Sequence, residues 1–134
     1  MAAVLAGFLA ALFSFFANRL ALRSWGRPSL VWAVPLLEET AKTFSAFLLG
    51  APILMTHGIF GLVEGALDLL SRRNPPLAPP LLSVAGHLLF GALTQFMFHI
   101  TGALGIGVAA AAAAHCLWNL ATALAGPRKG KEER

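Results

Sequence analysis

Long apolar runs, separated by short stretches that contain glycine and proline, make up almost the whole chain. Each run approaches the roughly 20 residues that an α-helix needs to cross about 30 Å of hydrocarbon. Glycine and proline interrupt regular helices, so each break predicts a connection. The pattern predicts an all-α polytopic membrane protein, a single-domain bundle of about five transmembrane helices. The expected helices cover residues 2–22, 29–50, 52–71, 80–100 and 102–125, and a basic tail follows at 126–134.

The composition excludes an ordinary soluble domain. The chain has 134 residues, of which 57% are hydrophobic and 12% charged, whereas soluble domains carry about 25% charged residues. The pI of about 10.3 does not indicate a nucleic-acid partner, because nine of the ten basic residues lie at the ends of the apolar runs, between them or beyond them. Cys116 is the only cysteine, so neither a disulfide framework nor a thiolate zinc site is expected.

The basic residues also predict the orientation in a lipid bilayer. They cluster at the first connection, the third connection and the C-terminus, and the second and fourth connections have none. With five spans these three places fall on one side, which the positive-inside rule assigns to the cytoplasm. The N-terminus is then expected outside and the tail in the cytoplasm. A cleaved signal peptide is not expected, because no basic residue precedes the first apolar run.

Ionisable residues inside the apolar runs are the strongest functional signal, because each costs several kcal/mol in hydrocarbon unless it has a partner. Helix rise places them roughly 10–15 Å from the cytoplasmic ends of four different helices. Their common depth predicts one polar site in the cytoplasmic half of the bilayer. The residues of this site are Glu38, Glu39, Lys42, Glu64, His87, His115 and Asn119.

Structural explanations remain open for single members of this set and for neighbouring polar residues. A buried Lys42 would neutralise the charge of Glu38 or Glu39, and an isolated His or Glu often only ties helices together. Asp68 lies one turn from Arg72, which favours an interfacial ion pair. His57 and His99 fall near the outer ends of their helices, so both are expected at the membrane interface.

Three short motifs resemble those of the PrsW family of intramembrane proteases. EETAK at Glu38–Lys42 is similar to the EExxK motif, FGLVE at Phe60–Glu64 to FxxxE, and HCLWN at His115–Asn119 to the HxxxN type. His87 stands where the related family has another intramembrane histidine. The wider group includes the CAAX-processing and bacteriocin-immunity proteases, whose first motif is EExxxR. Here Lys42 is followed by Thr43, which favours the PrsW branch.

The resemblance implies a prokaryotic intramembrane endopeptidase that cleaves transmembrane or membrane-anchored substrates with a glutamate-activated water. Apolar surroundings raise the proton affinity of a carboxylate, so that it can act as a general base near neutral pH. Glu38 or Glu39 would be this base, and Glu64 or His87 would hold the water from the other side. No cofactor is expected, and a homo-oligomer is possible.

The remaining motif residues have supporting roles in this scheme. His115 and Asn119 would donate hydrogen bonds to the developing oxyanion of the scissile carbonyl. Lys42 would hold the two adjacent glutamates against their mutual repulsion.

Other functions use the same residues differently. One is a zinc protease with ligands from Glu38, Glu64, His87 and His115, since carboxylates and histidines are common zinc ligands. The sequence lacks HExxH, so we favour the metal-free mechanism. A proton relay would need a ladder of polar residues across the bilayer, whereas these residues cluster at one depth. A catalytically silent scaffold would have little reason to keep two adjacent buried carboxylates.

The orientation can be tested by cysteine labelling. A single cysteine at Ala51 or Thr101 should react only with a reagent added outside, and one in the tail only with a reagent added from the cytoplasm. Cytoplasmic labelling at residue 51 would contradict both the orientation and the shared depth of the polar residues.

Overall fold

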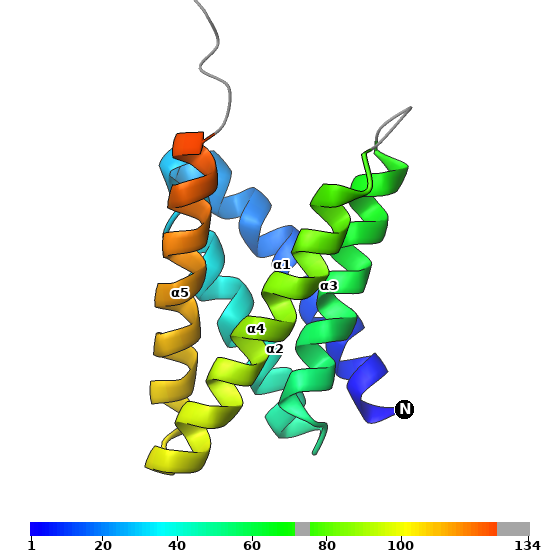
Figure 1. Ribbon diagram of the computed structural model, residues 1–134, viewed down its shortest axis with the longest axis vertical. Helices are drawn as coiled ribbons and strands as arrows, with labels where there is room; N and C mark the ends of the chain where they lie inside the picture. The colour runs from blue at the N-terminus through cyan, green and yellow to red at the C-terminus, as the bar shows by residue number, and fades with distance from the viewer. Residues whose placement is uncertain (72–75, 126–134) are drawn as a thin grey trace, which may run out of the picture.

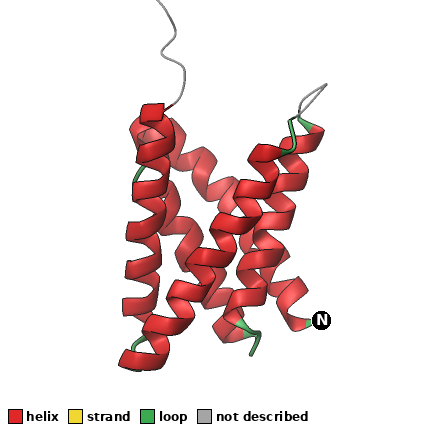
Figure 2. Ribbon diagram, viewed as in Figure 1, coloured by secondary structure: helices red, strands yellow, loops and turns green. Residues whose placement is uncertain are grey.

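The computed structural model describes residues 1–71 and 76–125, and the described chain is helical without any strand (Figure 1, Figure 2). The all-α bundle expected from the sequence is therefore confirmed. Arg72, Arg73 and the predicted basic tail at 126–134 lie outside the described residues. The elements are α1 (Ala2–Trp25), the 3-10 helix η1 (Arg27–Leu30), α2 (Ala33–Leu48), α3 (Ile53–Leu70), α4 (Ala78–Thr101) and α5 (Leu104–Ala125).

Four of these helices, α1, α3, α4 and α5, are long and apolar enough to cross a membrane, with 18 to 24 residues each. By length and composition the chain is therefore a membrane protein. The other long element, α2, has only 16 residues and contains three charged side chains. It begins at Ala33, four residues after the predicted start, because the 3-10 helix with Pro28 in its first turn comes first. Pro35 then lies in the first turn of α2, where its missing N–H costs little, so it does not kink the helix.

Successive helices run in opposite directions (Figure 1). The N-terminus and the connections α2–α3 and α4–α5 lie at one end of the bundle. We call the other end the connection-one end. It holds the connection α1–α2, the ends of α3 and α4 that flank the third connection, and the last turn of α5. Gly102 closes α4 with φ 68, a left-handed conformation that glycine adopts without strain.

The interior is built from small and polar side chains, and the large apolar side chains face outward. Ala6, Ala46 and Ala111 are fully buried, whereas most of the leucines and phenylalanines of α1 are exposed. In a bilayer this distribution is favourable, because lipid solvates large apolar groups and small residues let helices pack closely.

Glycines bring α3 and α4 into close contact beside the polar residues. A Cβ atom on Gly61 would lie 3.0 Å from the Cα of Val84 and 3.1 Å from the ring of His87. A Cβ atom on Gly65 would lie 3.1 Å from Pro80. Both glycines therefore set the separation of the two helices.

Gly61→Ala should destabilise the bundle, because the added methyl group meets the α4 backbone at Val84 and the buried side chain of His87. We expect a loss of about 1–3 kcal/mol in the free energy of unfolding, the usual range for overpacking. Gly105→Ala is the matched control, since no atom lies within 4 Å of its Cβ position. Unfolding in detergent micelles measures both variants, and equal stabilities would contradict the close packing of α3 and α4.

Candidate active site

A cavity of about 390 Å³, whose walls carry ionisable side chains among apolar ones, opens between α2, α3, α4 and α5. It lies toward the connection-one end, because its walls come from the first turns of α2, the last turns of α3 and α5 and the first turns of α4. The structure brings together five of the sequence-predicted residues on these walls: Glu38, Glu64, His87, His115 and Asn119. Asp68 also lines the cavity and is exposed at its rim.

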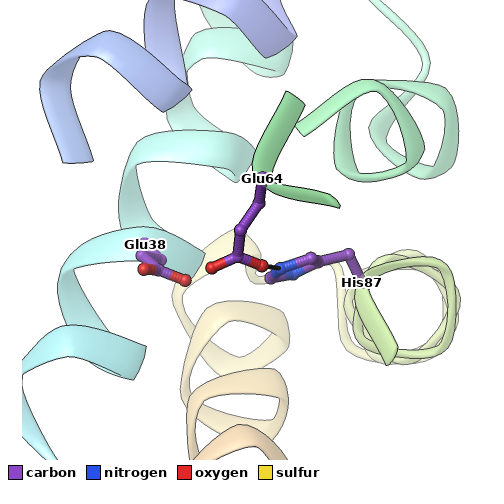
Figure 3. A group of neighbouring side chains, drawn as sticks. All are labelled: Glu38, Glu64 and His87. Atoms are coloured by element: carbon purple, nitrogen blue, oxygen red, sulfur yellow. Dashed lines mark hydrogen bonds and ion pairs between the residues drawn. The ribbon is translucent and has the colours of Figure 1, made fainter. Parts of the chain in front are cut away.

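Glu38, Glu64 and His87 lie close together among the residues that line the cavity (Figure 3). One side-chain N or O atom from each lies within 4.8 Å of those of the other two. His87 Nε2 is 2.7 Å from Glu64 Oε2, and Ser83 donates its hydroxyl to the same oxygen at 2.6 Å. The carboxylate of Glu38 points toward Glu64 from the opposite wall. A water molecule between these groups would contact all three.

Glu38 has one anchored oxygen and one free oxygen. Its Oε1 atom accepts a hydrogen bond from Asn18 Nδ2 of α1 at 2.7 Å. Its Oε2 atom has no hydrogen-bond partner within residues 1–71 and 76–125, and the residue lines the cavity with 4% of its surface exposed. Sequence reasoning missed Asn18. Its only signal was a lone amide side chain inside the first apolar run.

Glu39 occupies a dry position behind the cavity. It is fully buried, and its Oε1 atom accepts hydrogen bonds from Lys42 Nζ at 2.6 Å and from His115 Nδ1 at 2.9 Å. Its Oε2 atom is 3.5 Å from His57 Nδ1, too far for a well-formed hydrogen bond. The two adjacent glutamates therefore have different environments, because neighbouring residues point about 100° apart on a helix.

Lys42 connects Glu39 to His87. Its ammonium group is fully buried, 2.9 Å from His87 Nδ1 and 4.6 Å from the centre of the Phe60 ring. An ammonium group can only donate, so His87 Nδ1 must accept and Nε2 must carry the proton. His87 then donates its Nε2–H to Glu64, and a single hydrogen-bonded chain joins α2, α4 and α3.

The same reasoning assigns the proton on His115. A carboxylate can only accept, so His115 Nδ1 donates to Glu39. Its Nε2 atom has no hydrogen-bond partner in the described part of the chain, and the ring lines the cavity. Asn119 donates one Nδ2 hydrogen to the carbonyl of Leu30 at 2.8 Å and keeps a second hydrogen for a ligand. Phe90 stacks on the His115 ring at 4.7 Å between centroids, which fixes the ring plane.

His57 corrects one expectation. We expected it at the membrane interface, but it is fully buried, 3.3 Å from Thr43 Oγ1 and beside Glu39. Gly91 makes this possible, because a Cβ atom there would lie 2.8 Å from His57 Cβ. Position along the helix predicted its depth but not the face on which it lies. His99, by contrast, is exposed in the last turn of α4.

Known proteins do not identify this site: no family model, no curated protein and no solved structure matches the chain. The fold and the residues define its class, a membrane-embedded helical bundle with a polar cavity in one half and a buried charge network behind it.

Lys42→Met should strongly destabilise the protein, because it leaves the carboxylate of Glu39 buried without its cation. Breaking one partner of a buried ion pair costs about 3–5 kcal/mol. Adding Glu39→Gln to this variant should restore part of the loss, since the buried negative charge is then removed. Unfolding in detergent micelles provides the measurement. A Lys42→Met protein as stable as the parent would show that the pair is not the anchor of the site.

Proposed function

We propose that this protein is an intramembrane endopeptidase in which Glu38 activates a water molecule to hydrolyse a peptide bond of a membrane-associated substrate. One observation carries the proposal. Glu38 presents a carboxylate oxygen without a partner in the described chain to a cavity inside an apolar bundle, opposite Glu64 and His87. The resemblance of the three motifs to the PrsW family supports the same reaction.

In the proposed first step, a water molecule lies between Glu38 and the Glu64–His87 pair. Glu38 Oε2 takes one proton from this water as a general base, and the oxygen attacks the scissile carbonyl carbon. Glu64 holds the water from the other side, while its Oε2 atom is fixed by Ser83 and His87. Glu38 then passes the proton to the leaving amide nitrogen, so that it returns to the carboxylate form.

Asn119 and His115 would stabilise the negative charge that develops on the carbonyl oxygen. Hydrogen-bond donors that are held in position before the reaction are effective at this. Asn119 has a free amide hydrogen for this purpose. His115 can donate from Nε2 only when its ring carries both protons, and Glu39 stabilises that imidazolium from behind. Glu39 is thus a positioning residue in our proposal, because its burial separates it from the cavity.

The position of the cavity supports the substrate class and the orientation that we propose. It lies toward the connection-one end, and the basic residues Arg19, Arg23 and Arg27 belong to the last two turns of α1 and to the connection that follows it. We place this end on the cytoplasmic side of a prokaryotic cell membrane, with the N-terminus outside. The substrate would be a transmembrane or membrane-anchored protein segment.

A zinc-dependent hydrolase is the second candidate, because the approach of Glu38, Glu64 and His87 within 4.8 Å could hold a metal ion. Two features disfavour it. His87 Nε2 carries a proton in the hydrogen-bonded chain and would have to lose it to bind zinc. The Lys42 ammonium group, 2.9 Å from the same ring, adds a positive charge beside a cation site.

Glu38→Gln should lower kcat by about 10²–10⁴-fold, because the amide keeps the size and the bond to Asn18 but cannot take a proton. Cleavage of a panel of fluorogenic transmembrane peptides by the purified, reconstituted protein measures the loss. Asp68→Asn is the matched control, since it makes the same chemical change at the rim of the same cavity and should leave kcat unchanged. Full cleavage by the Glu38→Gln protein would contradict the proposed base.

A further inference from the structure

We infer that Asn18 of α1 is a positioning residue that holds Glu38 in the orientation needed for water activation. The inference rests on the proposed function and adds a helix to the catalytic unit. None of the sequence motifs includes α1, so by sequence alone this helix is only a membrane span. The contact with Glu38 gives it a specific role.

The geometry is direct. Asn18 Nδ2 lies 2.7 Å from Glu38 Oε1, across the interface between α1 and α2 and 20 residues away in the chain. An amide N–H that donates to a carboxylate forms a charge-assisted hydrogen bond, which is shorter and stronger than a neutral one. The bond fixes Oε1, and this leaves Oε2 as the oxygen that faces the cavity.

No other described side chain can replace this contact as the structure stands. Lys42, the nearest cation on α2, is committed to Glu39 and His87. Without Asn18, the Glu38 side chain has no hydrogen bond to any residue of 1–71 or 76–125. Nothing polar then holds its carboxylate against rotation about χ3, whose energy profile is broad. A base displaced by about 1 Å loses up to about 10²-fold in rate, because general base catalysis depends on the position of the proton acceptor.

Ser14 provides a matched control. It lies one turn before Asn18 on the same face of α1, it is 2% exposed, and its hydroxyl has no partner in the described chain. Ser14→Ala therefore changes a buried polar side chain of the same helix without touching Glu38. Asn18→Leu removes the donor at similar volume, Asn18→Ala removes it without adding bulk, and Asn18→Gln keeps an amide donor.

The first test is an infrared measurement, which needs no substrate. The difference spectrum between the parent and the Glu38→Gln protein gives the carboxylate band of Glu38. In the Asn18→Leu and Asn18→Ala backgrounds this band should shift, because the carboxylate has lost its hydrogen bond. It should stay in place in Ser14→Ala. An unshifted band in both donor-free variants, with the helical circular dichroism of the parent, would overturn the inference.

The second test uses the fluorogenic transmembrane peptide that the parent cleaves fastest. Asn18→Leu and Asn18→Ala should lower kcat by about 10–10²-fold with KM unchanged, since Asn18 acts through Glu38 and does not touch the substrate. Asn18→Gln should recover part of kcat, and Ser14→Ala should match the parent. In a Glu38→Gln background, Asn18→Leu should cost nothing further, because both changes remove the same function.

The outcomes separate the two proposals. If Glu38→Gln is inactive and Asn18→Leu cleaves like the parent, Glu38 remains the base and the role of Asn18 is refuted. If the parent cleaves no peptide of the panel, the proposed function and the catalytic meaning of Asn18 fail together. The infrared shift then still decides whether Asn18 orients Glu38.

Discussion

The buried ion pair between Glu39 and Lys42 is the interaction on which the arrangement of this bundle depends. A charge in an apolar interior is tolerated only when it is paired and hydrogen-bonded, and each of these two has partners on other helices. Glu39 meets His115 of α5 and lies beside His57 of α3, and Lys42 meets His87 of α4. The pair therefore fixes three helices around α2. Glu64, His87 and His115, which line the cavity, are the outer members of the same network.

This constraint explains why two adjacent glutamates have different environments. Glu38 and Glu39 are adjacent on α2, yet Glu39 is fully buried with two donors on its Oε1 atom, and Glu38 faces a cavity. The interior can hold the carboxylate of Glu39 only because neighbouring groups compensate its negative charge. Glu38, by contrast, has a single hydrogen-bond donor and access to water in the cavity. The small residues and glycines of the bundle also contribute to the site, because close packing of α3 on α4 brings Glu64 to His87.

The sequence predicted the class of fold and the layer of the site, because helix length and helix rise convert directly into depth. Glu38, Glu64, His87, His115 and Asn119 share one cavity for this reason. The rotation of each helix about its axis and the tilt between helices depend on tertiary packing. Neither can be derived from the depth of a residue along its helix. Asn18 and His57 were therefore missed, and the choice between Glu38 and Glu39 stayed open. The later start of α2 reflects local turn chemistry at Pro28 and Pro35.

The central claim is that this cavity hydrolyses peptide bonds with a water activated by a carboxylate and without a metal ion. The most direct measurement is cleavage of transmembrane peptides in heavy-oxygen water by purified protein treated with excess chelator, with metal analysis of the same sample. The account predicts continued cleavage without bound metal, with one heavy oxygen atom in the new carboxyl group of the product. Two results would contradict the metal-free mechanism. One is stoichiometric zinc that is lost together with activity, and the other is no cleavage either with or without chelator.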